Sequence, residues 1–528
     1  MRAFSQLLDD LTYTRSRNAK LRRIGDYLKS TPDPDRGYAL GALTGTLDIP
    51  HVKPAAIRAM AEEKIDPVLY KMSRDYVGDS AETIALLWDQ DRDYDDAPAN
   101  DIRLKDAVET LQSAKKTDAP LLLAAMLDRL DPSGRYALIK IATGALRVGI
   151  SARLAKVALA EAWERDVEKV EEVWHAFEPP FETLFAWAEG RADLPDLSSL
   201  PLFRPFMLAH PLEDEERIDL TDYAAEWKWD GIRVQLVRAG GETRLYSRTG
   251  DDIGQSFPDV CEAFDMAGVV DGELLVRGDH QGGEAGSFNA LQQRLGRKTV
   301  SKKMLAEAPA FVRLYDVLIE GSDDVRPMAW QVRRERLEQL MPRLDTDRFD
   351  LSQLVEADTF DQLEALREEA RDTGVEGLML KRKDSPYVPG RKVGLWYKWK
   401  RDPLNADCVL MYAQRGSGKR SSIYSDYTFG CWAEDGSLLP VGKAYFGFTD
   451  EELKWLDRFV RRNTLNRFGP VREVEKSLVL EVAFDSIHLS KRHKSGLAMR
   501  FPRISRIRKD KPAHEADRIE TLQAMVTG

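Results

Sequence analysis

Cysteine is scarce in this chain: the 528 residues include only Cys261, Cys408 and Cys431. Because these three stand far apart, they offer neither the paired framework of a disulfide-rich secreted domain nor the close spacing of a zinc module. We therefore expect a protein of a reducing, cytoplasmic compartment.

Long apolar runs are also missing. A membrane-spanning helix needs about 20 consecutive apolar residues, and no stretch of the sequence approaches that length. The N-terminal sequence MRAFSQLLDD reaches acidic residues too soon for a secretory signal. We therefore expect no membrane association, and a chain of this length has room for three or four domains.

The chain has no overall excess of positive charge, since its formal net charge is -10. That total argues mildly against a nucleic-acid partner, but phosphate binding depends on a local positive field. Residues 485–511 hold nine lysines and arginines against two aspartates, and residues 13–23 form a second basic run. Each run alone is most simply a solvated face, whereas several runs in a chain with phosphate chemistry would favour nucleic acid.

The residue pattern changes along the chain. Residues 1–200 have mostly helical periodicity, and residues 193–205 are rich in Pro, Ser and Asp, as in a linker. Over residues 206–401, short Val/Leu-rich strands alternate with helices, which indicates an α+β domain. Residues 403–528 combine short strands with one helix near residues 450–463, a pattern typical of an OB-fold barrel. We therefore predict a multidomain chain that is all-α, then α+β, then β.

Two helices of the first stretch are specific enough to be tested. Apolar periodicity predicts helices over residues 121–130 and 152–173, with Ser151 capping the second. The segment Gly144–Ser151 is then a short loop between helices. One interpretation is an ordinary turn in which Gly149 ends the preceding helix; a second interpretation, as a phosphate-binding loop, depends on the resemblance described below.

The most informative string is Glu226-Trp-Lys-Trp-Asp-Gly-Ile-Arg233, in which Lys228 ends a run of strand-forming residues before an Asp-Gly turn. A lysine amine is ordinarily protonated, with a pKa of about 10.4. It becomes a nucleophile only where burial or nearby cations lower that pKa. Alone, the string is weak evidence, because a surface strand followed by a turn would have the same sequence.

Further short motifs follow this string in a fixed order. They are Ser247–Gly250, Val270–Leu274, Leu314–Val317, Val375–Lys381, Trp396–Lys400 and Arg500–Ile504. With them the chain resembles the covalent nucleotidyltransferase superfamily of DNA ligases, RNA ligases and mRNA capping enzymes. Within that superfamily it looks most like the ATP-dependent DNA ligases of the bacterial three-domain type, over nearly the whole chain.

The resemblance implies a domain order and a reaction. The domains would be a helical DNA-binding domain over residues 1–200, an adenylation (nucleotidyltransferase) domain over 206–401 and an OB-fold domain over 403–528. The loop Gly144–Ser151 would then grip phosphates across the minor groove with backbone amides and an arginine. The implied reaction uses ATP to seal nicks in duplex DNA, with Lys228 attacking the α-phosphate and carrying AMP.

The residues around Lys228 take roles from the same resemblance. Glu226, which shares a strand face with Lys228, would accept a hydrogen bond from the adenine amine. Arg233 and Arg248 would hold phosphate or ribose, because a guanidinium forks onto such oxygens. Tyr315 would stack on adenine, although many relatives have phenylalanine there. The simpler alternatives are that Glu226 is an exposed strand residue, that the two arginines are surface charges, and that Tyr315 is a core aromatic.

Two carboxylates complete the implied site. Glu273 follows an apolar strand, and the resemblance implies that it contacts ribose and helps to hold a metal. Glu376 stands between glycine and aliphatic residues, which favours a pocket over a solvated loop. Mg²⁺ prefers oxygen ligands and recruits one or two carboxylates plus substrate phosphates. The pairing of these two carboxylates comes from the resemblance, because they lie far apart in the sequence.

Lys398 and Lys400 share one face of an expected strand, because side chains alternate with period two. Two cations beside the α-phosphate would stabilise developing negative charge and lower the pKa of Lys228; the alternative is a solvated basic face. Relatives carry an arginine six residues before the first of these lysines, where this chain has Lys392. We take Lys392 as the phosphate contact, with the adjacent Arg391 as the alternative.

Two further segments are judged by their motifs. Arg500-Phe-Pro-Arg503 resembles the ending of ligase-like chains, where the segment swings over ATP to orient pyrophosphate and then rotates away. Gly416-Ser-Gly-Lys419 is not a P-loop, because it lacks the upstream glycine and is followed by Arg420 in place of Ser or Thr. We interpret it as a basic, DNA-facing loop.

Other functions stay open on the sequence. An RNA ligase or a capping-type nucleotidyltransferase shares the lysine motif, and a non-catalytic DNA-binding protein could use the same scaffold. An NAD-dependent ligase is disfavoured, because relatives of that kind carry a cysteine zinc module. From the resemblance we expect a bacterial, cytoplasmic monomer that acts on nicked duplex DNA in repair or recombination, with a repair helicase or nuclease as a candidate partner.

Overall fold

The computed structural model describes residues 1–526 apart from residues 15, 78, 89–101, 145, 147, 214–217, 278–287, 298, 370–374, 416–422, 470 and 491–492. Contacts divide the chain into two units. One unit comprises residues 1–164, 178–185 and 402–528, and the other comprises residues 165–177 and 186–401. The predicted multidomain chain with a helical N-terminus and a β-rich C-terminal region is confirmed.

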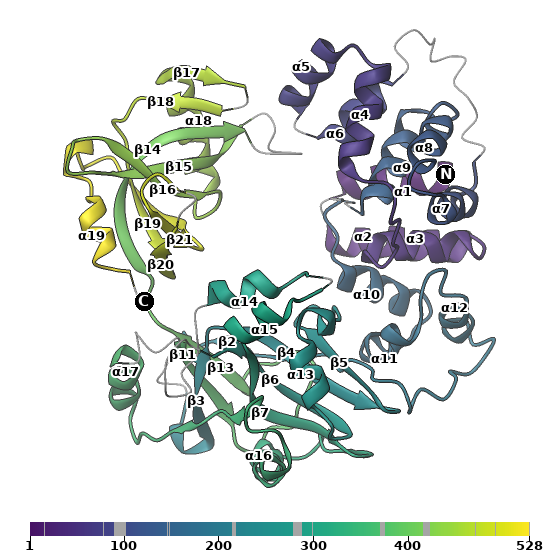
Figure 1. Ribbon diagram of the computed structural model, residues 1–528, viewed down its shortest axis with the longest axis vertical. Coiled ribbons are helices and arrows are strands. Elements are labelled where there is room, and N and C mark those ends of the chain that lie inside the picture. Colours follow the sequence, from purple (N-terminus) through teal and green to yellow (C-terminus); the bar gives the residue numbers. More distant parts are fainter. Residues whose placement is uncertain are drawn as a thin grey trace. The chain divides into compact units, whose positions relative to one another are not determined.

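The N-terminal residues are helical because their apolar side chains recur at helical spacing (Figure 1). In the first helix, Phe4, Leu7, Leu8 and Leu11 form the buried stripe. Burial of each such side chain contributes roughly 1.5–3 kcal/mol. The helices are α1 (Arg2–Tyr13), α2 (Arg17–Ser30), α3 (Asp35–Thr44), α4 (Pro54–Lys64), α5 (Pro67–Val77), α6 (Ser80–Leu87), α7 (Leu104–Ser113), α8 (Ala119–Leu127), α9 (Pro132–Thr143), α10 (Ala152–Ala162), α11 (Val167–Val173) and α12 (Glu182–Ala188).

The predicted capping of α10 is confirmed, since the Ser151 side chain accepts a hydrogen bond from the backbone of Leu154. Two other expectations are corrected. Residues 152–173 form two helices rather than one, because Glu164 adopts a φ of 52° after α10, a left-handed conformation that a helix cannot contain. The glycine that ends α9 is Gly144, with a φ of 67°, and not Gly149.

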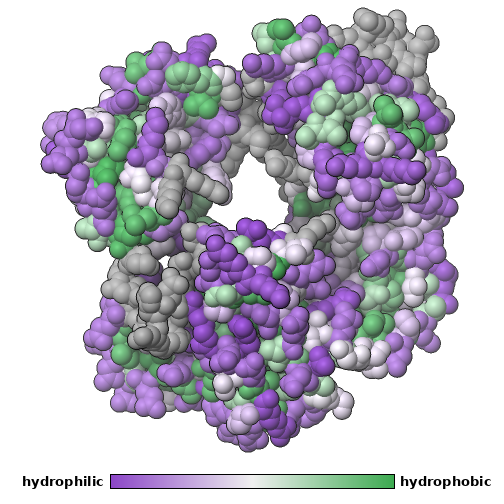
Figure 2. Space-filling model, viewed as in Figure 1, coloured by the Kyte–Doolittle hydropathy of each residue, from purple (hydrophilic) through white to green (hydrophobic). Residues whose placement is uncertain are grey.

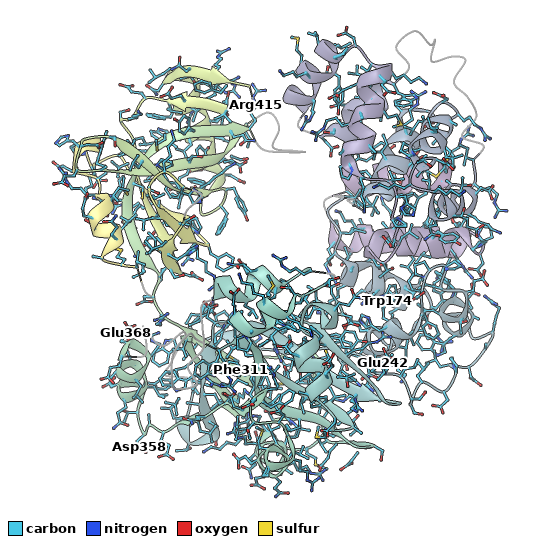
Figure 3. The ribbon with its side chains drawn as sticks, in the orientation of Figure 1. Trp174, Glu242, Phe311, Asp358, Glu368 and Arg415 are labelled. Atoms are coloured by element: carbon cyan, nitrogen blue, oxygen red, sulfur yellow. The ribbon has the colours of Figure 1, made fainter. Side chains whose placement is uncertain are left out.

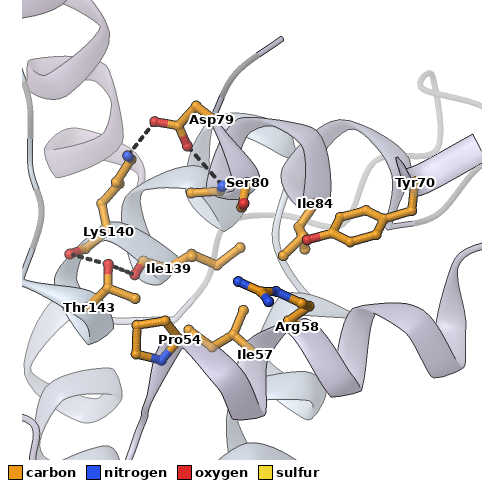
Figure 4. A pocket seen from close by; sticks show the side chains of 11 residues that line it. Pro54, Ile57, Arg58, Tyr70, Asp79, Ser80, Ile84, Ile139, Lys140 and Thr143 are labelled. Atoms are coloured by element: carbon orange, nitrogen blue, oxygen red, sulfur yellow. Dashed lines mark hydrogen bonds and ion pairs between the residues drawn. The ribbon is translucent and has the colours of Figure 1, made fainter. Parts of the chain in front are cut away.

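A cavity of 310 Å³ lies between α4, α5, α6 and α9 (Figure 4). On one side it is bounded by an ion pair of 2.5 Å between Lys140 of α9 and Asp79, which caps α6. The Lys140 side chain is 6% exposed and that of Asp79 is 24% exposed. The pair therefore stabilises the packing of α6 on α9 mainly by keeping a buried ammonium neutralised.

Replacing Lys140 by methionine is expected to lower the free energy of unfolding by about 2–3 kcal/mol. Breaking a fully buried pair costs about 3–5 kcal/mol, and the smaller value reflects the partial exposure of Asp79. Urea denaturation followed by circular dichroism measures the change. Lys105→Met is the control, because the ion pair of Lys105 with Glu109 is exposed, and its effect should stay within about 0.5 kcal/mol. Equal effects of the two variants would contradict this account.

The second unit contains two mainly antiparallel sheets (Figure 1). The first sheet has the order β10 (Leu354–Val355), β3 (Tyr223–Trp229), β11 (Val375–Arg382), β13 (Trp396–Lys400) and β2 (His210–Pro211). The second has the order β5 (Glu242–Ser247), β4 (Ile232–Ala239), β6 (Gly268–Val276), β7 (Ala310–Glu320) and β8 (Asp323–Asp324), and β9 (Phe349–Leu351) also pairs with β7. A short ladder joins β1 (Met207–Leu208) to β12 (Gly390–Arg391). The helices are α13 (Pro258–Ala263), α14 (Phe288–Arg294), α15 (Lys302–Glu307), α16 (Trp330–Leu340) and α17 (Phe360–Glu369).

The two sheets share one layer of buried side chains. Ala224 of β3 and Trp396 of β13 belong to the same cluster as Val237 of β4 and Val269 of β6. The opposite face of the first sheet packs on α17. Phe311, labelled in Figure 3, lies in β7 and is fully buried. Since side chains alternate along β3, residues that share the face of Ala224 point toward the second sheet.

The C-terminal residues form a seven-stranded sheet, which includes β14 (Leu404–Arg415), β15 (Tyr424–Trp432), β16 (Leu438–Ala444), β17 (Thr464–Phe468), β18 (Val471–Val474), β19 (Val479–Phe484) and β22 (Arg503–Arg508). A second ladder joins β20 (Ser486–Leu489) to β21 (Leu497–Arg500), and α19 (Ile519–Gln523) follows. The predicted helix near residues 450–463 is α18 (Asp450–Arg462), fixed by a capping box between Thr449 and Glu452. Beyond Arg415, labelled in Figure 3, the predicted basic loop at Gly416–Lys419 lies outside the described residues.

Hydrophilic residues cover most of the surface in view in Figure 2, with smaller hydrophobic patches between them. Among the described residues, no helix is long and apolar enough to cross a membrane. The apolar side chains are instead gathered into the buried clusters of the sheets and helices.

Candidate active site

Lys228 lies on the face of β3 that points toward the second sheet. Its strand register pairs it with Gly377 of β11, which is paired in turn with Lys400 of β13. Directly opposed residues of antiparallel strands point to the same face. The two lysines therefore flank a glycine that has no side chain to separate them.

The next row of the register brings two more charged residues to this face. Glu226 of β3 is opposite Met379 of β11, and Met379 is opposite Lys398 of β13. Lys398 and Lys400 therefore share a face, as the period-two pattern predicts. Since this face is turned toward the second sheet, all four charged side chains point into the space between the two sheets.

Glu376 joins this face through a β-bulge. The register shifts between Val375 and Gly377, so that β11 has one extra residue at this point. The Glu376 carboxylate contacts the Lys228 ammonium through Oε2, and the same oxygen lies 3.3 Å from the Lys400 Nζ. The carboxylate therefore links two lysines whose strands are not adjacent.

Glu273 approaches Lys228 from the second sheet, where it lies between Arg233 of β4 and Arg313 of β7. Burial raises the pKa of Glu273 to about 8, an effect that Lys228 opposes and that Glu376 reinforces. The structure therefore brings the predicted nucleophile and both predicted metal carboxylates together.

Replacing Glu273 by glutamine is expected to stabilise the chain more and more as the pH rises from 5 to 8. The pKa of Glu273 is raised from its ordinary 4.5 to about 8 in the folded state. Between these pH values the folded chain keeps a proton that the unfolded chain has lost, so the wild type loses stability as the pH rises. Glutamine does not titrate, so the variant should gain on the wild type by a few kcal/mol. Urea denaturation in EDTA at several pH values measures this difference, and a difference that does not change with pH would contradict it.

A group of cations surrounds Lys398. Its pKa is lowered first by burial and then by Arg391, Lys400, Lys228 and Arg248, in that order. Lys392 is not among these neighbours. The structure therefore brings the charges of Arg248 and Arg391 near Lys398, and the choice between Lys392 and Arg391 as the phosphate contact stays a prediction.

Arg233 is engaged elsewhere. Its guanidinium binds the buried Asp271 at 2.6 and 3.2 Å and donates to the Met207 carbonyl at 2.7 Å. Asp271 also accepts a hydrogen bond from the Tyr387 hydroxyl. These contacts give Arg233 a structural role beside the site, and its predicted contact with phosphate or ribose stays a prediction.

A lysine to which the sequence pattern assigned no role, Lys381, contacts Glu226. Lys381 of β11 is buried, and its Nζ donates to Glu226 Oε2 at 3.1 Å. The same ammonium lies 4.4 Å from the centre of the Tyr315 ring. Tyr315, the predicted stacking residue, is the extra residue where the register of β7 shifts against β6. The structure thus joins Glu226 and Tyr315 through Lys381.

The C-terminal arginines belong to the other unit. Arg500 ends β21, and Arg503 begins β22 with its guanidinium 3.6 Å from Asp485. Arg508 binds Asp407 and Asp510 at 3.1 and 2.9 Å. These ion pairs anchor β22 to its neighbours.

The comparisons with known proteins give one consistent result. A family model described as "ATP dependent DNA ligase domain" matches residues 206–400, and one described as "ATP dependent DNA ligase C terminal region" matches residues 420–511. The "Probable DNA ligase" of Koribacter versatilis (strain Ellin345) is 32% identical over 99% of this chain and 96% of its own length. The "DNA ligase 1" of Korarchaeum cryptofilum (strain OPF8) is 29% identical over 99% of this chain and 97% of its own.

A solved structure named Pmar-Lig_PreS3 covers 96% of this chain and 99% of its own chain with a TM-score of 0.58. At 15% identity this likeness concerns the fold alone. The family models together match more than half of the chain, and they include the strands that carry Lys228, Glu273, Glu376 and Lys398. The chain therefore belongs to the family of ATP-dependent DNA ligases.

Proposed function

We propose that this chain seals nicks in duplex DNA in three steps, through AMP bound covalently to Lys228. The observation that carries the proposal is the common face of Lys228, Lys398 and Lys400, closed on one side by Glu273 and Glu376. The cations on β13 are placed to attract a phosphate to this face.

In the first step the Lys228 ammonium gives up one proton, and the free amine bonds to the α-phosphorus of ATP and releases a second proton, while the bond from that phosphorus to pyrophosphate breaks. The Glu376 carboxylate, which contacts Nζ, is the nearest acceptor for the proton. Lys398, Lys400 and Arg391 stabilise the negative charge that develops on the phosphate oxygens. The product is a phosphoramidate between Lys228 and AMP.

In the second step a 5′-phosphate oxygen at the nick bonds to the same phosphorus, and the bond to Lys228 breaks. In the third step the 3′-hydroxyl bonds to the 5′-phosphorus, gives up its proton, and AMP leaves. Both steps depend on positioning of the reacting groups and on the same fixed cations, because the protein adds no further covalent chemistry.

Glu273 and Glu376 are the residues that would hold Mg²⁺. They fit a divalent cation, because burial first and then the neighbouring Glu376 raise the pKa of Glu273, and a bound cation would offset both effects. When bound, the ion supplies positive charge beside the phosphates. The adenine of ATP is assigned to Glu226 and Tyr315, and its phosphates to Arg391 and Arg248.

The finer features of the chain belong to the same proposal. We infer a helical DNA-binding domain over residues 1–200, an adenylation domain over 206–401 and an OB-fold over 403–528, in a bacterial cytoplasmic monomer. Repair or recombination is the inferred role, with a helicase or nuclease as partner. The DNA ligase names of the relatives favour this function over RNA joining or mRNA capping.

Retention of label from α-³²P-ATP on denatured protein tests the mechanism. Wild type should retain one label per chain, released by acid as expected for a phosphoramidate, and Lys228→Ala should retain none. Lys303→Ala, at an exposed position of α15, is the matched control and should be labelled normally. Label retained by the Lys228→Ala variant would reject the mechanism, and equal joining of nicked RNA and DNA duplexes would reject the substrate.

A further inference from the structure

Arg367 is a buried arginine of α17 whose guanidinium reaches the backbone of the first sheet. It is 4% exposed. The guanidinium lies 4.4 Å from the centre of the Trp399 ring, on the face of the sheet that packs on α17. Nη1 donates a hydrogen bond of 2.9 Å to the backbone carbonyl of Lys400, and Nη2 pairs with Glu364 of the same helix at 3.2 Å. Arg367 thus joins α17 to the end of the strand that carries Lys400.

The strand geometry explains why the Lys400 carbonyl needs a partner of this kind. Within the described part of the chain, β2 is in register with β13 only at Tyr397 and Lys398, and the Leu212 N–H donates to the Lys398 carbonyl at 3.0 Å. Carbonyls two residues apart on a strand point to the same side. The Lys400 carbonyl therefore points to the side of β13 where the pairing with β2 has ended, and Arg367 supplies the donor that a longer β2 would have given.

The same strand end is tied to the bulge of β11 on its other side. The Arg401 N–H donates to the Glu376 carbonyl at 3.0 Å, and the Glu376 carboxylate lies 3.3 Å from the Lys400 Nζ. The strand ends at Lys400, and the chain enters the other unit at Asp402. Strand ends open more readily than strand centres. Arg367 therefore anchors the last residue of β13 from the side that β2 leaves open.

We propose that Arg367 is a positioning residue for the transfer of AMP to Lys228, because it fixes the end of β13 so that the Lys400 ammonium stays beside Glu376. The inference rests on the proposed function, in which Lys400 stabilises charge on the phosphate. Arg367 acts through the backbone: its guanidinium lies with Trp399 on the α17 face, whereas side chains alternate and that of Lys400 points to the other face. A displacement of about 1 Å in a catalytic group can cost about 10²-fold in rate.

A double-mutant cycle tests this inference, because a positioning residue loses its effect once the residue that it positions is gone. The rate is single-turnover labelling of Lys228 from α-³²P-ATP at saturating ATP, taken per folded chain. Arg367→Met keeps an apolar chain against Trp399 but cannot donate, and should slow labelling by about tenfold. Lys400→Met should slow it by about 10²-fold. The double variant should stay within about twofold of Lys400→Met, whereas independent effects would multiply to about 10³-fold.

Arg294→Met is the matched control, because Arg294 is a fully buried cation of the same unit that binds Asp259 and the backbone of Ser256 and Ala308. The factor by which it changes the rate should be the same in the wild type and in Lys400→Met. Should Arg367→Met fail to fold, Arg367→Gln goes through the same cycle, since glutamine keeps an amide donor on a shorter side chain. It should slow the wild type by about threefold and Lys400→Met not at all.

The outcomes separate the two proposals. If wild type retains no label from ATP, the proposed function fails. If wild type is labelled on Lys228 but the change at Arg367 slows Lys400→Met by the same factor as it slows the wild type, only the positioning role of Arg367 is overturned. That role is also overturned if Lys400→Met is as fast as the wild type, or if the effect of Arg294→Met vanishes in the Lys400→Met background, because general loosening would then explain the cycle.

Discussion

Replacing Lys398 by methionine is expected to slow the transfer of AMP to Lys228 by about 10²- to 10³-fold, the usual effect of removing one fixed group that stabilises transition-state charge. Lys398 lies among Arg391, Lys400, Lys228 and Arg248, which together with burial lower its pKa. Glu376 offsets only part of this positive charge, and the remainder is what the proposed binding of phosphate requires. Single-turnover labelling at saturating ATP measures the rate, and kcat should fall more than KM rises.

Lys392→Met is the matched control for this prediction. Lys392 is near in sequence but is not one of the charges that act most on Lys398, so its variant should stay within about threefold of the wild type. Arg391→Met should lie between the two, at about tenfold. If Lys392→Met slowed the reaction as much as Lys398→Met, the phosphate contact would return to Lys392, where the sequence first suggested it.

Elements that depend on local periodicity were predictable. Lys398 and Lys400 share a face because side chains alternate along a strand with period two. Ser151 caps α10 because a serine before an apolar periodic run can accept a hydrogen bond from a free backbone N–H of the first helical turn. The helix α18 was likewise predictable from its residues. In each case the residues within one element were enough to fix the outcome.

Features that depend on register between distant strands were not predictable. Glu376 contacts Lys228 through a bulge in the pairing of β11 with β3, which the residues of β11 alone do not reveal. Arg233 is captured by Asp271, and only the pairing of β4 with β6 brings these two together. The contact of Lys381 with Glu226 was not predicted, although the motif Val375–Lys381 was noted. Nothing in the sequence indicates that Lys381 is buried beside Glu226.

The choice between Arg391 and Lys392 shows the same limit at single-residue scale. The family pattern counts residues back from Lys398 and arrives at Lys392. In the structure Arg391 belongs to β12 and pairs with Leu208 of β1, which fixes its backbone, and its charge acts on Lys398. Neighbouring residues of a strand point to opposite faces, so spacing alone does not decide which of the two side chains reaches the phosphate.

Gly377→Ala is expected to lower the free energy of unfolding by about 3 kcal/mol or more and to slow AMP transfer by about 10²-fold. Gly377 separates Lys228 from Lys400, has a φ of 145°, and a Cβ there would lie 2.2 Å from the Trp399 carbonyl oxygen. Backbone cannot yield as a flexible side chain would, so β13 must move away from β11. A shift of about 1 Å in catalytic groups can cost 10²-fold in rate. Denaturation and single-turnover labelling measure the two effects.

Gly241→Ala isolates the steric part of this effect. Gly241, in the β4–β5 hairpin, also has a positive φ, 83°, but a Cβ there would meet nothing within 4 Å. Its variant should therefore lose only about 1 kcal/mol from backbone strain and keep its rate of AMP transfer. Equal losses of stability and rate in the two variants would contradict the view that the close approach of β11 and β13 holds Lys400 beside Lys228. If Gly377→Ala alone lost both, the absent side chain is what allows two cations and Glu376 to share one phosphate-binding face.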